Sequence, residues 1–383
     1  MGGLSRWAVF LAVFLCVYGS LHLYLLVKVR RAYYVEGWGY ILLVVVLLFL
    51  MLAPIQARLL DVQGHALSAL MMTWIGYLWM GYIFMFVCLA IPLDGYHMAA
   101  ATLQQLFNAD WTHIMLSRRQ NMALVAVVIV GLMIYGAYAA FQVPVNQITL
   151  HSTKVPEAVG RVRIVQISDL HLGPMTYPGR LGPILNAIRE ARPDILVSTG
   201  DLVDGPLRDS ATVAGLLRAL PAPMGKFAVI GNHEFYLGIQ SAIQFTQSAG
   251  FTLLRGEAIQ VADGIVLAGV DDPTGGRPQG ATETELLAAV PDDHFAILFK
   301  HRPVLEHAND RRFDLQLSGH THNGQIFPFG LLIGLVYPLK AGWHPAGPGS
   351  HIHVNRGTGT WGPPIRILAP PEITVIDLIS KQR

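Results

Sequence analysis

Four long stretches without a charged side chain dominate the first 150 residues and restrict what this part of the chain can fold into. Asp, Glu, Lys and Arg are absent from Trp7–Val27, Tyr40–Ala57, Leu67–Leu93 and Gln120–Thr153. About 20 residues of α-helix cross a bilayer core of roughly 30 Å, and each run supplies that length or nearly so. The sequence therefore predicts an all-α bundle of four transmembrane helices, at about 7–27, 38–57, 68–91 and 122–142. A cleaved signal peptide is the alternative for the first run, but only Arg6 precedes it and no cleavage site is clear.

Charged residues are distributed unevenly along the chain. Of its 383 residues 52% are hydrophobic and only 14% charged, against about 25% charged in ordinary soluble domains. The 27 basic and 25 acidic side chains concentrate in the second half, because residues 1–150 hold only 11 of them. We therefore expect a membrane domain over 1–150 and a soluble domain over 151–383. The net charge of +2, without a basic patch, argues against a stable nucleic-acid partner.

The basic residues that flank the predicted spans indicate an orientation. The first and third connections carry five of them and the N-terminus and second connection two: Lys28, Arg30, Arg31, Arg118 and Arg119 against Arg6 and Arg58. Because Lys and Arg accumulate on the cytoplasmic side, both termini and everything after residue 150 are expected outside the cytoplasm. In a bacterium this is the periplasmic or extracellular side of the inner (plasma) membrane.

The second half begins with the stretch VRIVQISDLHLG, residues 162–173. Its first part is a β-branched apolar run that predicts a buried strand, and Asp169 and His171 follow where the run stops. Side chains two residues apart in an extended chain project from the same face. A carboxylate and an imidazole that project together are a usual beginning of a metal site, although this pair alone is a weak signal.

Strand and helix patterns alternate through most of the second half. Helices are expected over 183–192, 209–220 and 239–249, and strands over 194–199, 226–230, 295–299, 314–317, 350–355 and 372–378. This alternation predicts a layered α/β sheet whose functional sites gather at the carboxyl ends of its strands. Three further strand-like segments, 251–254, 258–261 and 265–268, favour a second, more antiparallel sheet.

Side chains of metal-binding types follow five of these strand-like runs. They are Asp169, His171, Asp201, Asn232, His233, His301, His320 and His322. Oxygen and imidazole donors without a thiolate suit borderline divalent metals such as Mn, Fe, Zn or Co. One ion would leave many of these donors unused, whereas two ions about 3.5–4 Å apart, bridged by one carboxylate, would use nearly all of them. The glycines that precede Asp201, Asn232 and His320 fit the tight turns such a site needs.

The order of these motifs resembles that of the calcineurin-like metallophosphoesterases. The blocks D-x-H, G-D-x-x-D, G-N-H-E, a single His and G-H-T-H follow one another in the family's order. S-D-L-H-L-G, G-H-T-H-N-G-Q and P-P-E-I-T-V-I at 370–376 are similar to the membrane-associated branch that contains the bacterial YkuE and YaeI phosphoesterases. The resemblance covers about 160–380. It implies a β-sandwich flanked by helices and the activity of a metal-dependent phosphoric ester hydrolase.

The resemblance also implies roles for individual residues. Asp169, His171 and His322 would bind one metal ion, Asn232, His301 and His320 the second, and Asp201 would bridge the two. His233 resembles the family's catalytic histidine, and Asp204 the acid that orients its imidazole. The expected reaction is hydrolysis of a phosphate mono- or diester by a metal-activated hydroxide without a phosphoenzyme. His233 would donate a proton to the departing alkoxide or stabilise charge.

The substrate stays open at this point. The apolar stretch Phe327–Trp343, expected to be a loop, comes directly after the last candidate ligand. In a membrane-tethered domain it favours a lipid substrate or a surface that faces lipid, while core packing is the alternative. A nucleotide-linked substrate is a further possibility. The alternative function is a membrane receptor or scaffold whose phosphoesterase-like domain binds a ligand without hydrolysing it, although degenerate domains of that kind usually lose metal ligands.

Overall fold

The computed structural model describes residues 3–108, 110–176, 178–207, 209–276, 279–306 and 313–381. The chain forms two compact units. The first consists of residues 1–136 with 362–364, and the second of residues 137–361 with 365–383.

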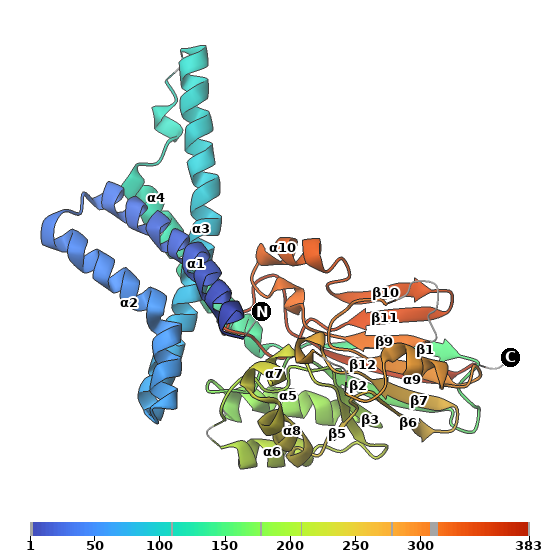
Figure 1. The fold of residues 1–383 in the computed structure, drawn as a ribbon. Helices are drawn as coiled ribbons and strands as arrows, with labels where there is room; N and C mark the ends of the chain where they lie inside the picture. Colours follow the sequence, from blue (N-terminus) through green and yellow to red (C-terminus); the bar gives the residue numbers. More distant parts are fainter. Residues whose placement is uncertain are drawn as a thin grey trace. The chain divides into compact units, whose positions relative to one another are not determined.

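The first unit contains three of the four long apolar helices that the sequence predicts and most of the fourth. The four are α1 (Gly3–Tyr33), α2 (Gly37–Val62), α3 (Ala66–Phe107) and α4 (Arg118–Phe141), with a short 3-10 helix, η1 (Thr112–Ile114), before the last (Figure 1). Each is long and apolar enough to cross a membrane. Helix α3 continues well past the predicted end at residue 91. Asp94, where the uncharged run stops, does not end the helix, because Lys28 and Tyr24 pair with its carboxylate.

The second unit contains two six-stranded sheets (Figure 1). The first has the order β1-β12-β2-β3-β4-β5, with bounds Val145–Ser152, Ile373–Ser380, Arg161–Ile167, Ile195–Ser198, Lys226–Ala228 and Thr252–Leu253. The second has the order β10-β11-β9-β8-β7-β6, with bounds Gly342–Gly347, Ser350–Val354, Leu315–Ser318, Phe295–Phe299, Ile265–Gly269 and Glu257–Ala262. The helices are α5 (Pro178–Ala191), α6 (Ser210–Arg218), α7 (Asn232–Leu237), α8 (Ile239–Ser248), α9 (Glu283–Ala288) and α10 (Phe329–Val336). Two 3-10 turns, η2 (Pro273–Gly275) and η3 (His322–Gly324), complete the described elements.

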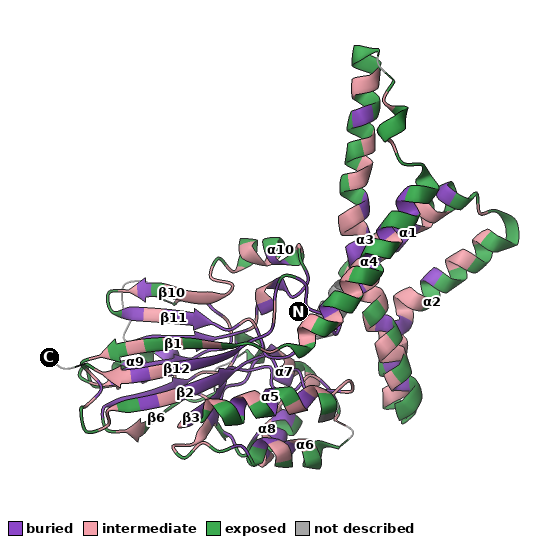
Figure 2. Cartoon of the chain, turned by 180° about the vertical axis from the view of Figure 1, so that it is seen from behind, coloured by how far each residue is buried: buried purple, intermediate pink, exposed green. Residues whose placement is uncertain are grey.

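Side chains that alternate between the two faces of the central strands divide the core into layers. On β2, Val162 and Ile164 pack between the two sheets, whereas Val165 and Ile167 pack under helices α5, α6 and α8. Side chains on successive strand positions point to opposite faces, so one buried strand serves both layers. A third cluster, which includes Leu286 of α9, covers the outer face of the second sheet. The central strands are accordingly buried on both sides (Figure 2). The predicted sandwich of sheets flanked by helices is confirmed.

Several expected details differ in the structure. The segment 251–254 was expected in the second sheet, but β5 pairs in parallel with β4 at the edge of the first. The second sheet has two antiparallel pairs, β6 with β7 and β10 with β11, whereas the first has one, β12 with β2. It is thus the more antiparallel of the two, as expected, although its inner strands β7, β8, β9 and β11 pair in parallel. Strand β1 begins at Val145, before the boundary expected at residue 150. That boundary was placed from the distribution of charged residues, and β1 contains polar residues but no Asp, Glu, Lys or Arg. Part of the expected loop 327–343 is the helix α10.

Candidate metal centre

Every predicted site residue follows a strand of one of the two sheets. Asp169 and His171 follow β2, Asp201 and Asp204 follow β3, Asn232 and His233 follow β4, His301 follows β8, and His320 and His322 follow β9. Strands β2, β3 and β4 are parallel neighbours in the first sheet, and β8 and β9 are parallel neighbours in the second. The carboxyl ends of parallel neighbours lie at the same edge of their sheet. The structure brings all nine side chains together there.

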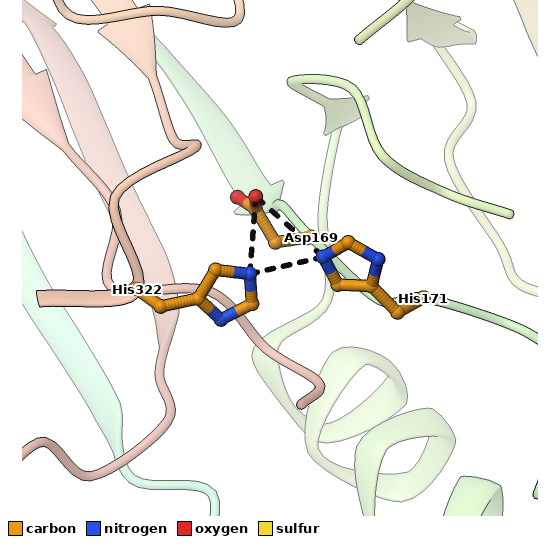
Figure 3. Close-up of side chains that lie close together, drawn as sticks. All are labelled: Asp169, His171 and His322. Atoms are coloured by element: carbon orange, nitrogen blue, oxygen red, sulfur yellow. Dashed lines mark hydrogen bonds and ion pairs between the residues drawn. The ribbon is translucent and has the colours of Figure 1, made fainter. Parts of the chain in front are cut away.

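The first group of donors consists of Asp169, His171 and His322, all buried (Figure 3). The Nε2 atoms of the two imidazoles are 2.9 Å apart. Asp169 Oδ1 lies 3.4 Å from His322 Nε2 and 4.0 Å from His171 Nε2. One carboxylate oxygen and two ring nitrogens therefore face a common point.

The second group is formed around His301, which is fully buried. Its Nε2 atom lies 3.1 Å from Asn232 Oδ1, 3.1 Å from His320 Nδ1 and 3.2 Å from Asp201 Oδ2. Asp201 Oδ2 is also 3.8 Å from His171 Nε2 in the first group. The Asp201 carboxylate thus lies between the two groups, where a bridging ligand would be needed.

In His301 and His320, one ring nitrogen forms a hydrogen bond away from the centre, and the other ring nitrogen faces the centre. His301 Nδ1 lies 2.8 Å from the carbonyl of Thr199 and donates to it, which leaves the lone pair of Nε2 toward the centre. His320 Nε2 lies 3.1 Å from the hydroxyl of Tyr337, and its Nδ1 faces the centre. Such outer contacts fix the tautomer of a metal-binding histidine. Converging lone pairs repel one another unless a proton or a cation lies between them. The donor set therefore fits divalent metal ions.

Burial and neighbouring charges shift the pKa values within the centre. Burial, reinforced by the charge on His301, lowers the pKa of His320 to about 3. Burial also lowers the pKa of His322 to about 4. Both imidazoles are therefore neutral at neutral pH, which is the form that binds a metal. Burial disfavours the charged form of His301 too, but the Asp201 carboxylate outweighs it and raises the pKa of His301 to about 10. A metal ion at His301 would have to displace a proton, because a histidine binds metal in its neutral form.

Unusual backbone conformations place several of these side chains. Asp169, His171, Asp201, His320 and His322 all have φ between 49° and 74°. This left-handed region costs a non-glycine residue roughly 1–2 kcal/mol, and residues held there cluster at functional sites.

Glycines beside these residues leave room for their side chains. A Cβ on Gly231 would lie 2.2 Å from Asp201 Oδ1, and one on Gly319 would lie 2.2 Å from Asp169 Oδ2. The predicted reason for these glycines, a tight turn, is thus incomplete. At Gly231 and Gly319, space beside a carboxylate is the requirement that the structure shows.

His233 and Asp204 form a separate pair at the edge of the centre. His233 Nδ1 donates to Asp204 Oδ1, while its Nε2 lies 3.9 Å from Asp201 Oδ2. Burial opposes the charged form of His233, but the hydrogen bond with Asp204 and the nearby carboxylates raise its pKa to about 8. Its side chain is 13% exposed, more than that of His171 or His301. His233 is therefore placed to hold a proton at the edge of the donor groups.

The sequence reasoning missed Glu234, the last residue of the G-N-H-E block. Its buried carboxylate accepts hydrogen bonds from four backbone N–H groups, those of Asp201 (3.1 Å), Leu202 (2.6 Å), Val203 (3.2 Å) and Gly231 (2.9 Å). It thereby joins the two loops that carry Asp201 and Asn232. Burial and the charge of Asp201 raise the pKa of Glu234 to about 7.

Replacement of Glu234 by glutamine is expected to weaken metal binding by about 10- to 100-fold, as loss of an outer contact does in other metal sites. The amide keeps the shape, but its NH₂ group would face backbone N–H donors in place of an acceptor oxygen. Competition with a fluorescent chelator measures the affinity. Glu257→Gln, an exposed position on β6, is the matched control. Equal metal affinity in the two variants would show that the carboxylate does not position the loops.

Arg366 was also missed, although it is fully buried. Its guanidinium donates to the backbone carbonyls of His322 (3.1 Å), Arg356 (2.9 Å), Gly357 (3.1 Å) and Ala369 (3.3 Å). These hydrogen bonds connect the segment 356–369 to the turn that carries His322. Because Arg366 lies 44 residues from that histidine and belongs to no motif, only the fold shows this role.

The chain is similar to several known proteins. The family model described as calcineurin-like phosphoesterase matches residues 162–324. A metallophosphoesterase of Aquifex aeolicus is 38% identical over 253 residues, which are 64% of this chain and 97% of the relative. The metallophosphoesterase YkuE of Bacillus subtilis is 38% identical over 61% of this chain and 84% of its own length. A transmembrane protein with metallophosphoesterase domain from Danio rerio is 30% identical over 356 residues, 88% of this chain and 80% of the relative.

Proposed function

Because the chain belongs to the calcineurin-like phosphoesterase family, and is thus a metal-dependent phosphoesterase, we propose that it hydrolyses a phosphate mono- or diester at a dinuclear metal centre. The observation that carries this proposal is the convergence of two donor groups on either side of Asp201. Asp169, His171 and His322 would hold one ion, and Asn232, His301 and His320 the other, with Asp201 shared. Mn, Fe, Zn and Co are the metals that such donors suit.

Two divalent ions bound there would supply an activated water and neutralise charge on the phosphoryl oxygens. The protein's own side chains would provide the metal ligands in their deprotonated form and a general acid. His233, whose Nδ1 is held by Asp204, would donate the proton on Nε2 to the departing alkoxide. Positioned acids of this kind contribute roughly 10²–10⁴-fold to the rate. No side chain is assigned to attack phosphorus, so no phosphoenzyme is expected.

Hydrolysis of 4-nitrophenyl phosphate and bis(4-nitrophenyl) phosphate by the detergent-solubilised full chain tests the proposal. Activity should disappear after treatment with a chelator and return when Mn²⁺ is added, and acid quenching should trap no phosphorylated protein. Activity that survives complete metal removal, or a phosphohistidine, would contradict the mechanism. Bound metal without turnover of either ester class would favour the receptor alternative.

We further propose that the four apolar helices, within residues 1–150, anchor the chain in a membrane and that the phosphoesterase domain, 151–383, lies outside the cytoplasm. The transmembrane relative from Danio rerio supports the anchoring, and the basic residues of the first and third connections support the side. In a bacterium this corresponds to the periplasmic or extracellular side of the inner membrane. The substrate proposed is a phosphate ester, of the lipid or the nucleotide-linked class.

Labelling of single cysteines in intact cells is expected to show this orientation. The natural cysteines, Cys16 and Cys88, are replaced by alanine, and Glu36→Cys or Asp292→Cys is introduced at an exposed position. A maleimide that does not cross membranes should label Asp292→Cys at once and Glu36→Cys only after lysis. The reverse pattern would place the domain in the cytoplasm.

A further inference from the structure

Exposed apolar side chains of the second unit gather on and beside α10. Six of them are at least half exposed and are called the apolar rim here: Phe327, Leu331, Leu332, Leu335, Val336 and Leu368. Among the described residues from 145 to 381, Tyr236 and Trp361 are the other large hydrophobic side chains with that exposure. The sequence of α10, FGLLIGLV, contains no polar side chain, whereas a helix on a water-facing surface normally has a polar face. Figure 2 shows the exposed surface of this helix.

The apolar rim adjoins the metal centre. Helix α10 packs on the η3 turn that carries His322, so closely that a Cβ on Gly324 would lie 2.2 Å from the backbone nitrogen of Gly330. At the other end of the helix, the hydroxyl of Tyr337 lies 3.1 Å from His320 Nε2.

The two remaining exposed aromatic residues lie beside the candidate acid. The ring centroids of Tyr236 and Trp361 are 5.4 Å and 5.8 Å from that of His233. Trp361 is held in place through its backbone, which exchanges two hydrogen bonds of 2.8 Å with the side chain of Gln325. Apolar side chains thus flank the centre on the side of His320 and on the side of His233.

Other features of this chain indicate that a lipid bilayer covers the apolar rim. The chain has four helices long and apolar enough to cross a membrane, and only residues 142–144 separate the last of them from β1. Three extended residues reach about 10 Å. A domain attached by so short a segment to a membrane-spanning helix remains at the bilayer surface. Leucine and aromatic side chains are the types that enter the boundary between head groups and acyl chains.

We propose that the apolar rim inserts into the membrane interface and presents the metal centre to a phosphate ester that is itself held in the bilayer. The inference rests on the proposed function and adds the substrate class, an amphiphile with a phosphoester head group. In the reaction, water oxygen bonds to phosphorus, the P–O bond to the alcohol breaks, and the leaving oxygen receives a proton. The acyl or alkyl part stays in the membrane.

Quenching by nitroxide-labelled lipids tests the insertion without any turnover. Leu335→Cys and the control Ile259→Cys on β6, each in the chain without Cys16 and Cys88, carry a bimane label in phosphatidylcholine proteoliposomes. The label at position 335 should be quenched at least twofold more strongly than the label at 259. Equal quenching overturns insertion, and a blue shift at 335 without lipid quenching, the sign of a protein partner or a second copy, overturns it too.

A pair of substrates with the same leaving group tests the substrate class. Hexadecyl 4-nitrophenyl phosphate in vesicles should be hydrolysed with at least tenfold higher kcat/KM than methyl 4-nitrophenyl phosphate in solution. The double variant Leu332→Gln with Leu335→Gln should lose this preference and keep the rate on the methyl ester within about twofold, while Ile259→Gln changes neither.

A wild-type chain that prefers the methyl ester overturns the inference and leaves the proposed function intact. If the chain hydrolyses none of the three compounds, the two diesters and 4-nitrophenyl phosphate, the proposed function is overturned, and this inference with it.

Discussion

Asp201→Asn is expected to lower kcat/KM for 4-nitrophenyl phosphate esters by more than about a hundredfold, beyond the 10- to 100-fold that loss of an outer-sphere contact costs. Asp201 Oδ2 lies 3.2 Å from His301 Nε2 and 3.8 Å from His171 Nε2, so the carboxylate faces both donor groups. An asparagine offers one oxygen and one NH₂ donor, and it cannot serve two cations with the same charge. The metal content should fall from two ions per chain toward one.

Asp293→Asn is the matched control, because the side chain of Asp293 is 82% exposed and loses the same charge. Its activity and metal content should equal those of the wild type. If Asp201→Asn retained both ions and more than a tenth of the activity, the shared position assigned to Asp201 would be wrong.

His233→Ala is expected to remove about 10²–10⁴-fold of the rate while the metal content stays unchanged, since a positioned acid contributes that much and His233 is assigned to neither ion. The size of the loss should depend on the leaving group. A phenyl ester, whose oxygen must be protonated as it departs, should show the full loss, and a 4-nitrophenyl ester, which leaves as a stable anion, a much smaller one. Asp204→Asn should show the same dependence with a smaller loss, because the asparagine oxygen can still accept the hydrogen bond from Nδ1 but no longer stabilises the protonated imidazole with a negative charge.

His151→Ala, at an exposed position on β1, serves as the histidine control. Rates of the phenyl and 4-nitrophenyl esters, together with metal analysis, separate the possible roles of His233. An equal loss with both leaving groups would argue against proton donation. Loss of metal from His233→Ala would show that the imidazole is a ligand.

The clustering of the candidate site residues could be predicted from the sequence because of where these residues stand relative to the strands. Asp169, Asp201 and Asn232 follow parallel neighbours of one sheet, and His301 and His320 follow parallel neighbours of the other. Residues at such ends meet whatever the length of the chain between them. Apolar runs and strand-end residues therefore predicted that these side chains lie together, whereas their individual roles and the pairing of Asp204 with His233 were implied by the family resemblance.

The contacts that the sequence did not predict depend on backbone groups and on distant parts of the chain. Glu234 binds four N–H groups, and Arg366 binds carbonyls, so neither has a partner that a motif would reveal. The segment 251–254 was assigned to the wrong sheet because an apolar strand pattern does not specify its neighbour. The stretch Phe327–Trp343 was expected to be a loop, but residues 329–336 within it form the helix α10, because a short apolar run does not by itself distinguish a helix from other buried or exposed segments.

The metal content of the purified full chain tests the central claim most directly. Elemental analysis together with protein quantification should find two divalent ions per chain, and stepwise chelation should remove them in parallel with the hydrolysis of 4-nitrophenyl phosphate esters. A chain that binds one ion or none after saturation with Mn²⁺, Fe²⁺, Zn²⁺ or Co²⁺, or one that stays active without metal, would contradict the account.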